Sequence, residues 1–203
     1  MRKVIVFDLW ETLACKRICI MQKLLSRFEV PIHDGVFTRY EATVQLQRWK
    51  SMEEMAENFL REFKLSVTSA NVREVTVTFR HGIDQATLFP GIASLLTRLV
   101  REEHRLAILS NTTIFESAVV DRWDLARYFD ACVYSWQTGA LKPNPKSFEA
   151  LLAALEVGVE DVLYIDDRLA NVQAAHLFGF HSLQFSSVIQ CRERLGDLGY
   201  LPF

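Results

Sequence analysis

The sequence is poor in cysteine and in turn-forming residues, and it has no excess of charge of one sign. Its 203 residues include 4 cysteines, 8 glycines and 5 prolines. Cys15 and Cys19 are too far apart for a C-x-x-C motif and have no matching pair downstream. The composition therefore excludes a disulfide framework, a collagen-like chain and a low-complexity chain, and we interpret the cysteines as reduced thiols.

Neither the charge nor the apolar runs indicate nucleic acid or a membrane as a partner. The chain has 23 basic and 25 acidic residues, which gives a formal net charge of −2. The longest apolar runs, such as residues 150–155, are far too short to cross a bilayer. At the N-terminus, MRKVIVFD places an aspartate after only a short apolar stretch, which is not typical of a signal peptide. We therefore expect a cytoplasmic protein.

Five short apolar runs separated by amphipathic segments predict an α/β fold. The expected strands are residues 4–7, 106–109, 131–134, 162–165 and 181–185. The stronger runs are continuously apolar, as in strands buried on both faces of a sheet. From residue 90 onward, helical patterns alternate with these strands. Such alternation is typical of a parallel sheet with helices on both faces.

The segment from residue 15 to residue 86 interrupts this alternation. Its apolar residues repeat with a helical period around residues 18–28, 36–48, 52–63 and 72–83. Residues 75–79 also alternate like a strand, but the helical period holds over a longer span. We therefore expect a helical cap domain at 15–86, inserted into a core formed by 1–14 and 87–203.

Polar residues follow directly after four of the predicted strands. In chain order they are Asp8 with Thr12, then Ser110 with Asn111, then Lys142, and finally Asp166 with Asp167. The carboxyl ends of parallel strands share one edge of the sheet, where ligands bind in open α/β folds. Each residue alone fits a turn or a helix cap. Together, and each at a strand end, they predict one functional site.

The chemistry of this group indicates phosphoryl transfer. Three carboxylates at one edge repel one another unless a cation lies among them or a pKa rises. Oxygen ligands of this kind suit Mg²⁺. Lys142, Ser110 and Asn111 suit an anionic, oxygen-rich group such as phosphate. An aspartate can serve as the nucleophile in phosphoryl transfer by forming an aspartyl-phosphate.

The same residues resemble the motifs of the haloacid dehalogenase superfamily, whose members are mostly Mg²⁺-dependent phosphohydrolases. The four motifs are matched by VIVFDLWETL, LAILSNTT, GALKPNPKSF and YIDDRLANV. The resemblance covers nearly the whole chain and implies a Rossmann-like core with a helical cap between the first two motifs. The fourth motif and the C-terminal segment look most like the branch that includes the phosphatase domain of epoxide hydrolases and small sugar-phosphate phosphatases.

The resemblance implies a catalytic or binding role for five residues. Asp8 would attack phosphorus, and Thr12 belongs to the same nucleophile motif. Ser110 and Lys142 would hold the transferring phosphoryl group, and Lys142 would also steady Asp8. Asn111 would contact the substrate, which we expect to be a small phosphorylated molecule.

The resemblance also implies a Mg²⁺ site. Asp8, the backbone carbonyl of Trp10 and Asp167 would ligate the ion. Asp166 belongs to the same acidic pair, and we place it at the metal site as a supporting residue.

One position departs from the family pattern. The family's phosphatases usually carry an aspartate two residues after the nucleophile, as general acid and base, and here this residue is Trp10. Such a group is typically worth about 10² to 10⁴ in rate, and an indole can perform neither role. The neighbouring Glu11 is a candidate substitute acid. The leading hypothesis is thus a Mg²⁺-dependent phosphatase that is weakened by Trp10.

Two alternatives remain open. The family's 2-haloacid dehalogenases also have an aromatic residue at this position, but they use no metal and lack the acidic pair. The first alternative is therefore a metal-independent 2-haloacid dehalogenase. The second is a catalytically impaired binding protein on the same fold. The oligomeric state, monomer or homodimer, is left open by the sequence.

Overall fold

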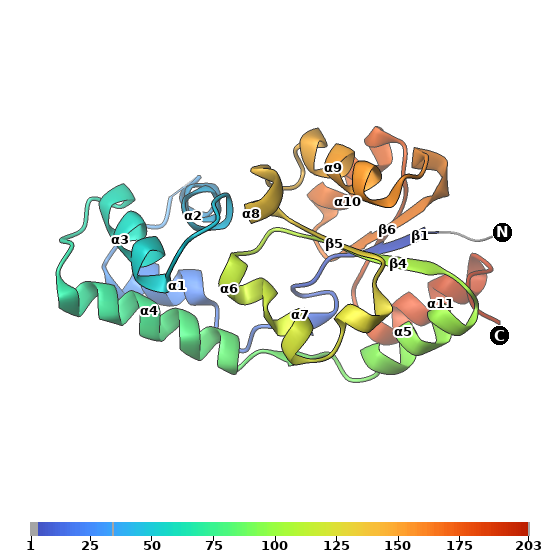
Figure 1. Cartoon of the computed structure of the whole chain (residues 1–203), viewed down its shortest axis with the longest axis horizontal. Helices are drawn as coiled ribbons and strands as arrows, with labels where there is room; N and C mark the ends of the chain where they lie inside the picture. The colour runs from blue at the N-terminus through green and yellow to red at the C-terminus, as the bar shows by residue number, and fades with distance from the viewer. Residues whose placement is uncertain (1–3, 34, 203) are drawn as a thin grey trace.

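The computed structural model describes residues 4–33 and 35–202, which form a sheet-containing core and a cap of helices (Figure 1). The core sheet has five strands in the order β5-β4-β1-β6-β7, and every neighbouring pair is parallel. Its strands are β1 Val4–Phe7, β4 Arg105–Ser110, β5 Ala131–Tyr134, β6 Val162–Asp166 and β7 His181–Gln184. The predicted α/β fold with a parallel sheet is confirmed.

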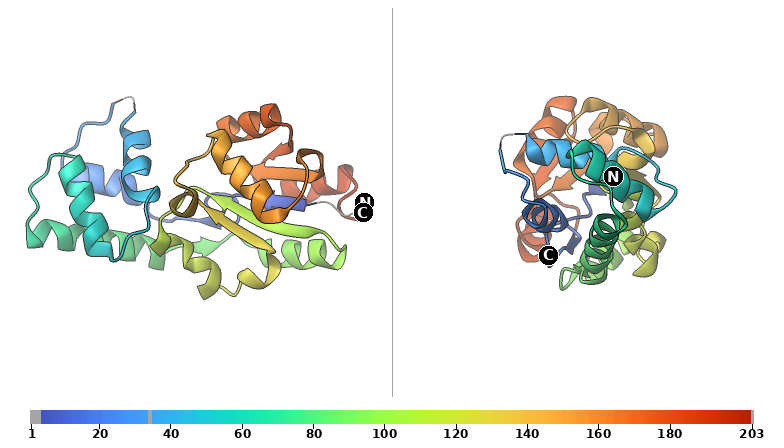
Figure 2. Two further views of the ribbon diagram at one scale, coloured as in Figure 1. Left: turned by 45° about the horizontal axis from the view of Figure 1, so that its top comes forward. Right: turned by 90° about the vertical axis from the view of Figure 1, so that its left-hand side faces the viewer.

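Helices cover both faces of the sheet (Figure 2). They are α5 Ile92–Arg101, α6 Ile114–Ser117, α7 Val119–Arg122, α8 Ser135–Thr138, α9 Pro145–Leu155, α10 Leu169–Phe178 and α11 Val188–Asp197, with 3-10 turns η1 Ala126–Tyr128 and η2 Val159–Asp161. Successive side chains of a strand point to opposite faces. Accordingly, Ile5 and Phe7 pack with residues of α5, α7 and α11, while Val4 and Val6 pack with residues of α9 and α10. Each buried aliphatic side chain contributes roughly 1.5–3 kcal/mol.

The cap has a hydrophobic core of its own. It consists of the four predicted helices, α1 Ile20–Arg27, α2 Val36–Gln45, α3 Met52–Glu62 and α4 Ser69–Asp84. Val75 and Phe79 are buried in the cap core from one face of α4, so the helical period was the correct interpretation of this segment. Gly82 lies against Ile20, where an added Cβ would come within 2.3 Å of the Ile20 side chain. Glycine at this position therefore allows α1 and α4 to approach closely.

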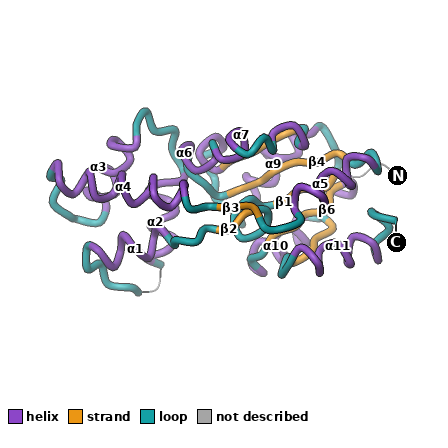
Figure 3. Tube along the Cα trace, turned by 90° about the horizontal axis from the view of Figure 1, so that it is seen from below, coloured by secondary structure: helices purple, strands orange, loops and turns teal. Residues whose placement is uncertain are grey.

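A two-stranded antiparallel ribbon lies where the chain passes between core and cap (Figure 3). It is formed by β2 Ala14–Cys15 and β3 Thr87–Leu88. Neither strand was predicted, because two residues are too few to show a period. The ribbon pairs the two ends of the predicted cap segment, although the exact division of the chain stays a prediction. Among the described helices, none combines the length and the apolar character that a membrane span requires.

Candidate active site

The pairing of β1 with β6 brings three carboxylates together. Phe7 pairs with Ile165 in the parallel register, so Asp8 and Asp166 follow at the same level of the sheet. The backbone N–H of Asp8 donates to the carbonyl of Ile165 at 2.8 Å. Carboxylate oxygens of Asp8, Asp166 and Asp167 all lie within 4.8 Å of one another. Residues more than 150 positions apart in the sequence thus share one site, as their positions at strand ends predicted.

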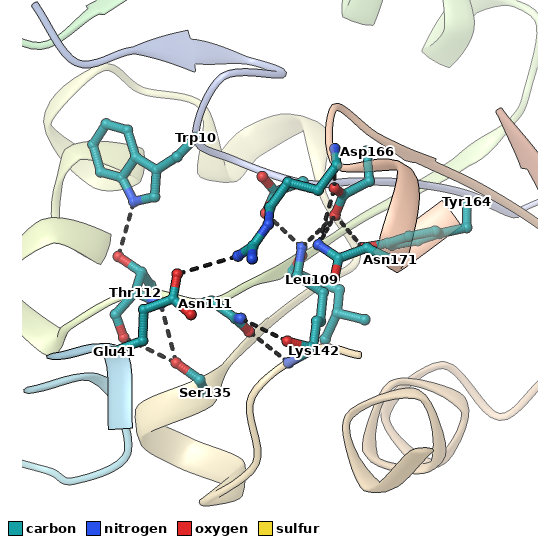
Figure 4. A network of polar contacts seen from close by, with 12 residues as sticks. Trp10, Glu41, Leu109, Asn111, Thr112, Ser135, Lys142, Tyr164, Asp166 and Asn171 are labelled. Atoms are coloured by element: carbon teal, nitrogen blue, oxygen red, sulfur yellow. Dashed lines mark hydrogen bonds and ion pairs between the residues drawn. The ribbon is translucent and has the colours of Figure 1, made fainter. Parts of the chain in front are cut away.

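Lys142 is buried between Asp8 and Asp166, and Figure 4 labels the lysine and Asp166. Its Nζ lies 2.7 Å from Asp8 Oδ1 and 2.7 Å from Asp166 Oδ2, and it donates to the carbonyl of Leu109 at 2.9 Å. Asn111 holds the backbone of the lysine, because its Oδ1 accepts from the Lys142 N–H at 2.8 Å and its Nδ2 donates to the Lys142 carbonyl at 3.0 Å. Asn111 therefore positions the lysine loop, and its contact with substrate stays a prediction.

Asp166 is surrounded by hydrogen-bond donors from the protein. Besides Lys142, it accepts from the hydroxyl of Tyr164, from the backbone N–H of Arg168 at 2.8 Å, and from Asn171 Nδ2 at 3.0 Å to each oxygen. Its side chain is fully buried. A carboxylate held by this many donors is fixed in orientation and stays ionised.

Tyr164 and Asn171 were not among the predicted site residues. Tyr164 lies two residues before Asp166 on β6, and therefore on the same face of the strand. This spacing was the signal that could have identified it. Asn171 lies in the first turn of α10, and its amide reaches Asp166 only because that helix starts directly behind the acidic pair.

The site carries more negative than positive charge. Burial, with the charge of Asp166 adding to it and Lys142 opposing it, raises the pKa of Asp8 to about 6. Burial and the charges of Asp8 and Asp166 raise the pKa of Asp167 to about 7. Burial alone would also raise the pKa of Asp166, but Lys142 and the donors around it hold that pKa below its usual value. Three carboxylates facing one ammonium form an oxygen donor set that fits a divalent cation.

Two further predicted residues carry buried hydroxyls. Ser110 closes β4 and is 1% exposed, and Thr12 lies in the nucleophile loop and is fully buried. Within the described ranges, neither hydroxyl has a hydrogen-bond partner. The Ser110 hydroxyl lies close enough to Asp8 to lower the pKa of that carboxyl, and its contact with an anionic ligand stays a prediction.

Trp10 forms part of the wall between the nucleophile loop and the cap. Its Nε1 donates to Thr112 Oγ1 at 3.0 Å. The Lys16 ammonium lies 4.2 Å from the centre of the indole ring and 2.5 Å from Glu116 Oε1. A cavity of about 210 Å³ adjoins these residues, with Tyr40 on the cap side. A space of this size suits a small molecule.

Two polar contacts join the cap to the core near the edge of the sheet at which the candidate site lies. Arg168 pairs with Glu41 of α2 at 3.1 Å, and the Ser135 hydroxyl donates to the carbonyl of Gln45 at 2.8 Å. Glu41 and Ser135 are labelled in Figure 4. These contacts were not predicted, since periodicity shows which face of a helix is buried within the cap but not which residues the other face contacts. Glu11 is exposed, and its carboxylate accepts from the Lys16 N–H at 3.1 Å.

Known proteins of similar sequence include one named a hydrolase and one named a phosphatase. Flavin mononucleotide hydrolase 1 of Arabidopsis thaliana is 28% identical over 109 residues, which are 54% of this chain and 44% of that protein. The chain thus matches less than half the length of this relative. Glyceraldehyde 3-phosphate phosphatase of Pyrococcus abyssi is 26% identical over 196 residues, 91% of this chain and 82% of that protein.

Solved structures and a family comparison agree on the fold. An enzyme of Bacteroides thetaiotaomicron, solved as an Asp-to-Ala variant in complex with magnesium and inorganic phosphate, has a TM-score of 0.68 and is 16% identical. The match covers 93% of this chain and 96% of that one, and at this identity it supports the fold alone. The family model of the haloacid dehalogenase-like hydrolases matches residues 2–179. The chain therefore belongs to the haloacid dehalogenase-like hydrolase family of enzymes.

Proposed function

We propose that this hydrolase is a Mg²⁺-dependent phosphatase that acts on a small phosphorylated molecule through an aspartyl-phosphate on Asp8. The observation that carries the proposal is the position of Lys142, whose ammonium contacts both Asp8 and Asp166 beside a third carboxylate. An ammonium at a nucleophilic carboxylate orients it and offsets the charge of an incoming phosphate. The relative named a phosphatase and the relative named a flavin mononucleotide hydrolase add support.

Each residue of the site has its own role in this proposal. Asp8 attacks phosphorus, and its pKa of about 6 leaves it largely ionised near neutral pH. Lys142 and the hydroxyl of Ser110, both beside Asp8, donate to the phosphoryl oxygens. Asn111 keeps the lysine loop in place, and Thr12 supports the nucleophile loop from its buried position. The fixed orientation of these groups lowers the cost of assembling the transition state.

The carboxylates fit the expected metal. Asp8, Asp167 and the backbone carbonyl of Trp10 would hold Mg²⁺, and the ion would supply charge neutralisation at the phosphoryl group. Asp166 lies within the same cluster, but its oxygens already accept from Lys142, Tyr164 and Asn171. We therefore assign Asp166 to positioning Lys142, next to the metal rather than on it.

A second candidate function is favoured by one observation. An aromatic side chain stands two residues after the nucleophile, as in the 2-haloacid dehalogenases, and Trp10 is 7% exposed in this position. A dehalogenase would work without metal. The acidic pair and the surplus of negative charge around Asp8 favour the phosphatase.

A panel of substrates distinguishes the two. Purified protein is assayed on 4-nitrophenyl phosphate, on small phosphorylated metabolites and on 2-chloropropionate, with Mg²⁺ and with a chelator. The phosphatase hypothesis predicts release of phosphate that needs Mg²⁺ and that Asp8→Asn abolishes. Release of chloride that persists in the chelator, with no release of phosphate, would instead establish the dehalogenase.

A further inference from the structure

A buried hydroxyl of the core contacts the cap at the end of a cap helix. Ser135 follows β5 as the first residue of α8, and 2% of its surface is exposed. Its Oγ donates to the carbonyl of Gln45 at 2.8 Å, and Gln45 is the last residue of α2. Beside this contact, the guanidinium of Arg48 lies 5.6 Å from the centre of the Trp136 ring. The C-terminal end of α2 therefore packs against the start of α8.

The same hydroxyl also contacts the core. Ser135 Oγ lies 3.1 Å from the carbonyl of Thr112 and accepts from the Thr112 N–H at 3.0 Å. A hydroxyl has one proton, so it can donate fully to only one of two carbonyls at a time. The shorter distance is the one to Gln45, whose carbonyl lies at the helix end and has no partner within the helix. If the cap moved away, water would bind the Gln45 carbonyl, and the proton would be available to Thr112.

Thr112 lies between two of the segments that form the candidate site. It is fully buried and follows Ser110 by two residues. Its Oγ1 accepts from Nε1 of Trp10, in the nucleophile loop, at 3.0 Å (Figure 4). The intervening Asn111 holds the backbone of Lys142 through two hydrogen bonds. A change in the hydrogen bonding of Thr112 would therefore act on the segment that carries Ser110 and on the nucleophile loop.

We propose that Ser135 is a positioning residue that couples the docking of the cap to the alignment of the segment 110–112. The inference rests on the proposed function, because that segment carries a hydroxyl assigned to the phosphoryl oxygens. The two states differ in the acceptor of one proton, which is the Gln45 carbonyl when the cap is docked and the Thr112 carbonyl when it is not. Coupling of this kind is reciprocal, so a ligand that fixes the segment in its docked arrangement also favours the docked cap.

The first experiment measures the coupling by NMR, without an assay of activity. Glu41→Arg sets a guanidinium against Arg168, and the repulsion between the two cations loosens the cap. The amide resonance of Thr112 reports the hydrogen bond from its N–H to Ser135. In a chain with Ser135, Glu41→Arg shifts this resonance. In a chain with Ser135→Ala, Glu41→Arg produces no further shift.

A control variant changes the charge of the cap without changing its contact with the core. Glu53 forms an exposed pair with Arg80, and both residues belong to the cap. Glu53→Arg therefore introduces the same repulsion within the cap, and it leaves the Thr112 resonance where it is. A shift of similar size for Glu41→Arg and Glu53→Arg would overturn the inference, because the shift would then reflect charge alone.

The second experiment is a double-mutant cycle on kcat/KM for 4-nitrophenyl phosphate with Mg²⁺. Ser135→Ala lowers kcat/KM by about twofold to tenfold, the range for one hydrogen bond. If Ser135 and Glu41 both act by docking the cap, Glu41→Arg lowers kcat/KM less in the Ser135→Ala protein than in the wild type. Thr76→Val is the control, because its buried hydroxyl donates to the Arg73 carbonyl within α4 at 3.0 Å. Its effect adds to that of Glu41→Arg.

The outcomes separate the inference from the proposed function. If no phosphate compound is hydrolysed, the proposed function fails, and the NMR experiment still decides whether Ser135 couples cap and core. If the Thr112 resonance shifts equally in the presence and in the absence of the Ser135 hydroxyl, or if the two kinetic losses simply add, Ser135 is structural only and the inference is refuted. Absence of any shift for Glu41→Arg in the chain with Ser135 also refutes it, and this measurement does not need the alanine variant to fold.

Discussion

Polar residues of the core and of the cap reach the same site but are held in different ways. In the core, Lys142 has 2% of its side chain exposed and makes three contacts to Asp8, Asp166 and Leu109. In the cap, Glu41 keeps 23% of its side chain exposed and pairs with Arg168, whose side chain is 52% exposed. Buried charges are costly to separate, whereas exposed pairs break at little cost. The comparison teaches that the groups proposed for catalysis are fixed by the core, while the Glu41–Arg168 pair of the cap is exposed enough to break at little cost.

This difference follows from how each region is built. The core residues lie at the ends of paired parallel strands, so the sheet register sets their positions. The cap is a separate hydrophobic cluster, and it meets the core through a two-stranded ribbon, polar contacts and apolar packing. In this packing Met52 and Ile83 of the cap contact the core cluster, and Ile114 and Phe115 of α6 contact the cap cluster. One of the polar contacts is the donation from Arg122 to the carbonyl of Ile83 at 2.7 Å. We therefore expect substitutions in the core to change stability and chemistry together, and substitutions in the cap to change mainly substrate binding.

The largest effect is expected from Lys142→Met. The substitution leaves Asp8 and Asp166 buried without their ammonium, and removing one partner of a buried ion pair costs about 3–5 kcal/mol. Urea unfolding measures this loss, and the same variant should have no detectable phosphatase activity. Lys146→Met is the control, since this lysine is exposed on α9 only four residues away. Equal stability of the two variants would show that the core lysine is not held as the distances indicate.

The next effect is the stabilisation by Mg²⁺ and its dependence on pH. The folded-state pKa values of Asp8 and Asp167 are about 6 and about 7, above the ordinary value of 3.8. A raised pKa gives a contribution to stability that is full below about pH 4 and is lost as the pH rises through the folded values. The metal-free protein should therefore lose stability from these two groups between about pH 4 and pH 7.

Mg²⁺ binds the ionised carboxylates, so its effect should run in the opposite direction. At a concentration of 100 times its Kd, the ion adds about 2.7 kcal/mol. Thermal unfolding should show a larger rise of Tm on adding Mg²⁺ at about pH 8 than at about pH 5. Asp167→Asn should remove most of this rise. A rise of Tm that is the same at both pH values would argue against a metal bound by these carboxylates.

A smaller effect is expected from Tyr164→Phe. The tyrosine hydroxyl donates to Asp166 inside the core, and hydrogen bonds to a charged group are worth about 2 kcal/mol. Because Asp166 also contacts Lys142, we expect kcat to fall while KM changes little. Tyr128→Phe, whose hydroxyl lies 3.2 Å from Thr97 outside the site, is the control for stability. A lower stability without any change in kcat would restrict Tyr164 to a structural role.

Much of the core site was predictable from the sequence, for a physical reason. Asp8, Ser110 and Asp167 each follow an apolar run, and the ends of parallel strands meet at one edge. Tyr164 and Asn171 were not predictable in the same way. A tyrosine within an apolar strand fits an ordinary core residue, and only the start of α10 behind the acidic pair turns an asparagine toward Asp166.

The cap was predicted as helices but not as a wall of the site. Its apolar period shows which faces of α1 to α4 pack inside the cap. Glu41 and Gln45 lie on α2 among polar and apolar neighbours, and no local pattern shows that they meet the core. Their contacts depend on how the ribbon of β2 and β3 orients the whole cap, which is a long-range property of the fold.

The smallest effect is expected from Glu41→Gln, which tests whether the pair between Glu41 and Arg168 is as weak as its exposure indicates. Loss of an exposed ion pair costs about 0.2–1 kcal/mol. If the pair with Arg168 holds the cap over the site, kcat/KM should fall by at most about fivefold, and high salt should produce the same loss in the wild type. Glu53→Gln is the control, because it removes an exposed pair with Arg80 within the cap. Equal kcat/KM for both variants would mean that Glu41 does not hold the cap over the site. A fall in kcat/KM far beyond fivefold for Glu41→Gln would mean that this cap residue is fixed in the site like the core residues, and it would contradict the difference between core and cap.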